Sequence, residues 1–128
     1  MALTLETSVR NAMADAIDAT VNIGAGTATF VFETAADGEV AAVNLQNPAF
    51  DTGGTGGAGV IQLAGTPLQD TTAAGGTIEH FSIYDRDAAK VLEGTVASPS
   101  GGDVNISSLT VAADDTVELT SFSITVPA

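Results

Sequence analysis

The sequence predicts a mainly β protein, a β-sandwich or jelly roll of about seven strands preceded by one amphipathic α-helix. Short runs rich in Val, Ile, Thr and Phe follow Gly26, and Gly, Asp, Asn and Pro separate them. Helical periodicity occurs in the first twenty residues. The length of 128 residues fits one domain (1–128), with the helix in residues 1–24 and the sandwich in residues 25–128.

The predicted helix runs from about Leu5 to Ala19, with Thr4 as the candidate N-cap. Its apolar residues recur at every fourth position: Leu5, Val9, Met13 and Ile17. Two interpretations of this face stay open. It packs on its own sandwich, or it docks between subunits or onto a larger assembly.

The predicted strands are residues 27–34, 40–46, 60–64, 77–85, 90–97, 104–111 and 116–126. In the first of them Ala28, Phe30 and Phe32 share one face, which predicts a half-buried strand with its aromatic side chains inward. In the last, the apolar residues change parity, so we expect a bulge or bend near Thr120 and Ser121 that lets the strand change sheets.

Two connections have distinctive patterns. Residues 83–92 predict a hairpin, because apolar runs flank a polar connection at 85–89. Residues 47–59 hold Pro48 and, from Gly53 onward, five glycines, which predicts a mobile surface loop whose near end Phe50 pins to the core.

Charge excludes some partners. There are 16 acidic against 3 basic residues, a formal net charge of −13, so nucleic acid and anionic membrane surfaces are not expected partners. Without cysteine there is no disulfide, thiolate catalysis or Cys-ligated zinc. The N-terminal segment is charged where a signal peptide is apolar, so we expect synthesis in the cytoplasm without export or a membrane anchor.

Sequence motifs give little indication of a catalytic or ligand-binding site. Gly54, Gly56 and Gly59 satisfy G-x-G-x-x-G, but a strand pattern follows where a dinucleotide site needs a helix. His80 is the only histidine, which excludes a multi-histidine metal centre, and no nucleophile elbow accompanies it. We expect His80 to be packed or hydrogen-bonded on the sheet surface.

Three pairs of acidic residues fall at predicted turns, where Asp is favoured because it accepts hydrogen bonds from nearby backbone amides. The pairs are Asp37 with Glu39, Asp85 with Asp87, and Asp114 with Asp115. Binding of a hard cation at one of these turns stays open, although the EF-hand spacing is not met. The sequence predicts no enzyme, no cofactor, and no catalytic or metal-binding residue.

Four segments carry a resemblance: MALTLETSVRNAMADAIDATVNIGAG, NPAF, HFSIYDRDAAKVLEGTV and DVNISSLTVAADDTVELTSFSITVPA. Together they resemble a family of small virion proteins of tailed bacteriophages, and the similarity covers most of the chain. Such proteins begin with an Ala- and Leu-rich helix ending in Gly-Ala-Gly and finish in a strand ending Thr-Val-Pro-Ala. The family often has an Asp-Gly hairpin turn, whereas Asp87 is followed here by Ala88.

The resemblance implies a capsid decoration (cement) protein on the outside of the virion, synthesised in the host cytoplasm. Its expected partners are the major capsid protein and further copies of itself, with a trimer favoured. The candidate interface residues are Leu5, Val9, Met13, Ile17 and Phe50. Partner contacts are also expected in the uncharged tracts 53–69 and 104–113, with the acids facing water. The alternatives are a head-fibre, tail or connector component, and a receptor- or glycan-binding module that uses the 47–59 loop.

Overall fold

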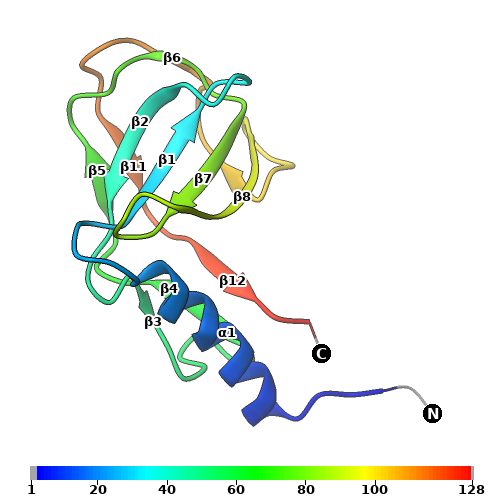
Figure 1. Cartoon of the computed structure of the whole chain (residues 1–128). Helices are drawn as coiled ribbons and strands as arrows, with labels where there is room; N and C mark the ends of the chain where they lie inside the picture. Colours follow the sequence, from blue (N-terminus) through cyan, green and yellow to red (C-terminus); the bar gives the residue numbers. More distant parts are fainter. Residues whose placement is uncertain (1–2, 128) are drawn as a thin grey trace.

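The computed structural model describes residues 3–127, which form one helix and twelve strands (Figure 1). The helix α1 (Thr7–Val21) comes first, and strands make up the rest of the regular structure. A mainly β domain with one N-terminal helix is therefore confirmed.

A five-stranded sheet forms the centre, in the order β2-β1-β7-β8-β9. Its strands are β1 (Thr29–Glu33), β2 (Glu39–Asn44), β7 (His80–Tyr84), β8 (Lys90–Ala97) and β9 (Val104–Asn105). The pairings are antiparallel except that of β8 with β9. The predicted hairpin is confirmed as β7–β8, and its turn places Ala88 at φ 65°.

Three smaller sheets complete the fold, in the orders β10-β6, β11-β5 and β12-β4-β3. Their strands are β3 (Phe50–Asp51), β4 (Val60–Leu63), β5 (Leu68–Asp70), β6 (Gly76–Thr77), β10 (Thr110–Val111), β11 (Val117–Leu119) and β12 (Ser123–Thr125). Figure 1 shows α1 beside β3 and β4, away from the five-stranded sheet. We call residues 3–28, 45–66 and 121–127 the helix end, and residues 29–44 and 67–120 the sheet end.

The final predicted strand divides as expected. β11 pairs with β5 and β12 pairs with β4, so the chain changes sheets after Leu119. The predicted run 104–111 is also broken, into β9 and β10, because the two halves pair with different strands. The short strands β3 and β5 lie in segments that the sequence predicted to be irregular or did not assign. The predicted strand 77–85 is divided, because Thr77 belongs to β6 and residues 80–84 form β7.

Aromatic side chains join the two ends. Phe30 stacks on Phe81 with ring centroids 4.6 Å apart, and Phe122 makes T-shaped contacts with both rings at centroid distances of 5.3 and 5.4 Å. The predicted inward face is confirmed, since Ala28, Phe30 and Phe32 are at most 2% exposed. Val31 on the opposite face is also buried, so β1 is covered on both faces and is not half-buried as predicted.

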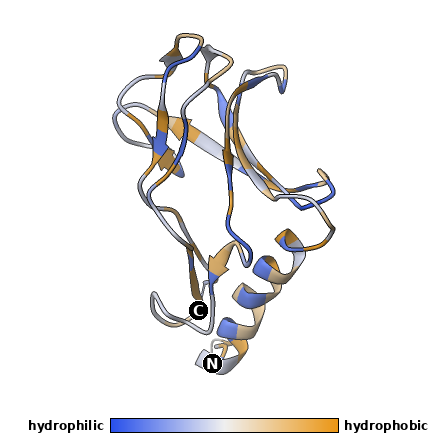
Figure 2. Cartoon of the chain, turned by 90° about the vertical axis from the view of Figure 1, so that its left-hand side faces the viewer, coloured by the Kyte–Doolittle hydropathy of each residue, from blue (hydrophilic) through white to orange (hydrophobic). Residues whose placement is uncertain are grey.

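The predicted apolar face of the helix is wrong in part. The residues of α1 that are buried are Ala14, Asp18 and Val21, whereas Val9 and Met13 remain 44% and 46% exposed. The helix also begins two residues later than predicted, and Glu6 occupies the N-cap position with no side-chain hydrogen bond. Thr4 is therefore not the cap. Hydrophilic positions recur along α1 (Figure 2), and their contacts explain the difference.

A row of polar acceptors joins α1 to the 47–59 segment. We call Asn11, Asp15, Asp18 and Asn22 the acceptor stripe, because each side-chain oxygen Oδ1 accepts a hydrogen bond from a backbone N–H. The donors are Gly59 to Asn11 (2.7 Å), Gly53 to Asp15 (2.9 Å), Phe50 to Asp18 (2.9 Å) and Ala49 to Asn22 (3.0 Å). The predicted mobile loop is thus held along the helix, and Phe50, 1% exposed, pins its near end as expected.

Candidate functional site

A polar cluster lies where β1 meets β7. Glu33 ends β1, and the register places it directly opposite His80 of β7. Ser82 and Tyr84 follow at alternate positions, so all three β7 side chains share the face of the sheet that carries Glu33. Asp37 joins from the turn between β1 and β2. We call these five residues the Glu33 cluster.

Glu33 is only 3% exposed, and three side chains meet its carboxylate. The Ser82 hydroxyl donates to Oε1 at 2.5 Å, and the Tyr84 hydroxyl donates to Oε2 at 2.6 Å. His80 Nε2 lies 3.1 Å from the same Oε1 and 2.9 Å from Asp37 Oδ1. His80 is therefore hydrogen-bonded at the sheet, as predicted, but its two carboxylate neighbours were not foreseen.

The order of these contacts differs from a catalytic triad. In a triad the imidazole lies between the serine and the acid and takes the serine proton. Here the carboxylate is central, and the Ser82 hydroxyl donates its hydrogen bond to Glu33 and not to His80. The arrangement fixes a carboxylate and an imidazole in place but does not activate a nucleophile.

The cluster raises the pKa of Tyr84 above its ordinary value of 10.0. The main cause is the hydrogen bond that the phenol donates to Glu33, and burial and the negative charge of Glu33 act in the same direction. Loss of the phenol proton would place two negative charges side by side.

The acidic turns have the structural role expected of them at two of the three pairs. Asp85 Oδ1 accepts hydrogen bonds from the backbone of Asp87 and Ala89, both at 2.9 Å, and Asp115 Oδ2 accepts one from Ala112 at 3.0 Å. Gly54 and Gly59 pack against α1 side chains, and the strand β4 follows them, not the helix that a dinucleotide site needs.

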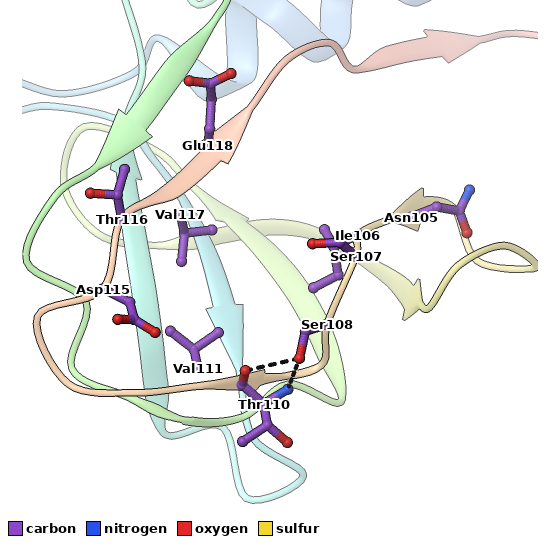
Figure 3. A pocket seen from close by; sticks show the side chains of 10 residues that line it. All are labelled: Asn105, Ile106, Ser107, Ser108, Thr110, Val111, Asp115, Thr116, Val117 and Glu118. Carbon is purple, nitrogen blue, oxygen red and sulfur yellow. Dashed lines mark hydrogen bonds between the residues drawn. The ribbon is translucent and has the colours of Figure 1, made fainter.

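A surface cleft of about 470 Å³ lies between the β9–β10 segment and β11 (Figure 3). Hydroxyl and carboxylate groups line it together with Ile106, Val111 and Val117. The Ser108 hydroxyl is engaged with the backbone of Thr110, donating at 3.0 Å and accepting at 3.2 Å. The lining residues include no His, Lys or Arg, so the cleft offers hydroxyl, amide and carboxylate groups without an imidazole or amine to activate a serine.

Exposed hydrophobic residues gather at the helix end. Among residues 3–127, the large hydrophobic side chains that remain exposed are Leu3 (90%), Val9 (44%), Met13 (46%) and Ile23 (55%). All four belong to α1 or to the residues that flank it. Val9 and Met13 are one turn apart and share a face of α1, whereas Leu3 and Ile23 lie beyond its opposite ends.

The structure does not place the five candidate interface residues on one surface. Val9 and Met13 are exposed, Leu5 and Ile17 are half-buried, and Ile17 packs against the core. Phe50 is 1% exposed and therefore offers almost no surface to a partner. Phe50 cannot both anchor the loop in the core and contact a partner protein in this fold. Its burial shows that it is a core anchor.

Charge is distributed unevenly between the two ends. Twelve of the sixteen acidic residues lie in the sheet end, whereas the helix end holds Glu6, Asp15, Asp18 and Asp51. Two of these four, Asp15 and Asp18, already accept hydrogen bonds from the 47–59 segment. The helix end is therefore the less charged and more apolar of the two.

Comparison with family models, with curated proteins and with solved structures finds no match for this chain. Within residues 3–127, no helix has the length and apolar character that crossing a membrane requires.

Sequence reasoning missed the Glu33 cluster. The alternation of His80, Ser82 and Tyr84 along one strand was a usable signal, because it marks a polar face opposite Phe81 and Ile83. The partnership with Glu33 was not visible, since it depends on the pairing of strands whose residues are 47 to 51 positions apart.

Proposed function

We propose that this chain is a structural protein of a tailed-bacteriophage virion, and specifically a capsid decoration protein that binds the major capsid protein on the outside of the head. The sequence resemblance supports the class of protein. The position of the exposed hydrophobic residues supports attachment through a defined surface: Leu3, Val9, Met13 and Ile23 all lie at the helix end.

The charge distribution supports the same orientation. Copies of a chain with a net charge of −13 repel one another at short distance unless the contacting faces carry little charge. In the proposed orientation the helix end faces the capsid, and the sheet end, with twelve acidic residues, faces water.

The proposed mechanism is mechanical. Each copy bridges neighbouring capsid subunits, and contacts repeated over the shell resist the pressure of the packaged DNA. An interface of standard size buries about 800 Å² per partner, and simultaneous attachment of linked copies multiplies a modest affinity. A trimer at three-fold positions would match the symmetry of the lattice.

The test is reconstitution on capsids that lack this protein. We expect saturable binding at hundreds of copies per particle and a higher disruption temperature of the coated heads, measured by cryo-electron microscopy and a thermal release assay. Saturation at about a dozen copies would instead indicate a connector ring and overturn the decoration role. Absence of binding, together with affinity for a host polysaccharide, would overturn the structural role itself.

A further inference from the structure

We propose that Glu33, Asp37 and His80 form a binding site for one divalent metal ion of the Zn²⁺ class, with water completing the coordination. This site is separate from the capsid-binding surface proposed above. One ligand atom from each residue is available, and the three atoms all lie within 4.8 Å of one another.

The ligand spacing is close to what such an ion needs. His80 Nε2 lies 3.1 Å from Glu33 Oε1 and 2.9 Å from Asp37 Oδ1. Ligands held about 2.0–2.2 Å from a tetrahedral zinc ion lie roughly 3.3–3.6 Å apart. Both distances from His80 would have to lengthen by a few tenths of an ångström to admit the ion. Asp37 can move because its side chain is 60% exposed, whereas the buried Glu33 requires the His80 ring, 19% exposed, to shift.

One hydrogen on the imidazole nitrogen cannot serve both carboxylates fully. His80 Nε2 carries at most one hydrogen, yet it faces two carboxylate oxygens at hydrogen-bond distance. Glu33 Oε1 also receives the Ser82 hydroxyl. A metal ion bound to the Nε2 lone pair would interact with both carboxylates at once. A single hydrogen on Nε2 forms a good hydrogen bond with only one of them.

The charge of the site also favours a cation. Buried charges in proteins are paired or coordinate a metal. In the described part of the chain, neither Glu33 nor Asp37 forms a salt bridge with Lys or Arg, and Lys90 pairs with Glu93. Lys90 lies opposite Tyr84 in the β7–β8 ladder and attracts Asp37 only at longer range. A divalent ion would balance the two carboxylates directly.

An outer shell that orients the buried ligand is already present. Ser82 and Tyr84 each donate a hydrogen bond to Glu33, one to each carboxylate oxygen. Such outer-shell bonds fix the orientation of metal ligands, and losing one weakens metal binding by roughly 10–100-fold. An imidazole with two carboxylates suits zinc and its first-row neighbours better than Ca²⁺ or Mg²⁺, which prefer oxygen ligands throughout.

The experiment is calorimetric titration of the full chain, made without a polyhistidine tag, with ZnCl₂ in a non-chelating buffer. We expect one Zn²⁺ per chain and a higher melting temperature in its presence. Asp37→Asn should weaken binding about tenfold or more, and His80→Gln should do the same. Because His80 is the only histidine, its imidazole NMR signals report directly whether the ion binds there.

Asp114→Asn is the matched control. Asp37 and Asp114 are both exposed and have φ 63° and 67°, a conformation that Asn also tolerates, so both variants should fold. Asp114→Asn should bind Zn²⁺ as the parent chain does. The proposal is overturned if Zn²⁺ shows no saturable binding, if Asp37→Asn binds it unchanged, or if the His80 signals do not respond. Tighter binding of Ca²⁺ than of Zn²⁺ would also overturn it.

Discussion

At the scale of single residues, Glu33 is the least exposed acidic side chain among residues 3–127. A buried carboxylate is costly unless hydrogen bonds compensate for its lost hydration. Glu33 receives hydroxyl donors from Ser82 and Tyr84 and contacts His80. Hydrogen bonds that involve a charged group are about twice as strong as neutral ones, so these three residues together keep the charge tolerable in the sheet.

The same contacts predict an unusual titration of Tyr84. Its pKa should lie above 10.0, and Glu33→Gln should lower it toward the ordinary value, because the main acceptor loses its charge. The sequence contains one Tyr and no Trp, so ultraviolet absorbance at high pH reports on this phenol alone. Glu118→Gln removes an acidic charge outside the cluster and should leave the titration unchanged.

The free energy of unfolding should depend on pH through the Tyr84 phenol. The folded-state pKa is raised, so folding favours the protonated phenol. This contribution is fully present below the unfolded value of about 10 and is lost as the pH rises through the folded-state pKa. Urea unfolding at several alkaline pH values measures it. A Tyr84 that titrates at its ordinary value in the parent chain would contradict the assigned hydrogen bond.

At the scale of elements, α1 shows why helical periodicity was an incomplete guide. The four-residue spacing of Leu5, Val9, Met13 and Ile17 does indicate a helix, and the helix exists. The acceptor stripe has equally regular spacing, but it consists of Asn and Asp. It faces the 47–59 segment because backbone N–H groups of that segment donate to it, and a buried N–H such as that of Phe50 needs an acceptor.

Asp18 should be the most important member of the stripe. Its contact with the Phe50 N–H is buried, so Asp18→Ala leaves a buried donor without a partner and should cost about 1–3 kcal/mol of unfolding free energy. Asp18→Asn keeps an acceptor oxygen and should lose less. Urea denaturation measures both, and faster hydrogen exchange of the Phe50 amide locates the effect.

Asp15→Ala is the matched control for that prediction. It makes the same substitution one turn earlier in α1, with the same gain in helix propensity of about 0.5 kcal/mol, but its bond to Gly53 is exposed. Its effect on stability should be close to zero. Equal losses for Asp15→Ala and Asp18→Ala would show that burial of the donor is not what makes the contact important.

At the scale of the whole molecule, local patterns predicted the elements well and their partners poorly. The change of sheet near Thr120 was predictable because the apolar residues switch from odd to even positions there. The hairpin β7–β8 was predictable from the polar turn between two apolar runs. The Glu33 cluster and the acceptor stripe were not, since each joins segments more than 25 residues apart. Which face of α1 is buried is likewise decided by the segment that packs against it, not by the helix sequence.

The separation of an apolar helix end from an acidic sheet end leads to a final prediction about attachment. Val9 is 44% exposed and lies in the first turn of α1, where an acidic side chain interacts favourably with the helix dipole. Val9→Asp should therefore fold normally, with a change in unfolding free energy within about 0.5 kcal/mol. It should nevertheless bind capsids at least about tenfold more weakly, because an unpaired carboxylate must lose its hydration in the interface.

Ser100→Asp introduces the same charge in an exposed loop of the sheet end, so it separates the effect of position from that of charge. This variant should coat capsids as the parent chain does, and binding isotherms for the two variants on the same capsids make the comparison. If Val9→Asp is folded and reaches the same copy number at the same concentration, α1 does not face the capsid. If both variants bind weakly, added negative charge alone reduces attachment, and the helix end has no special role in it.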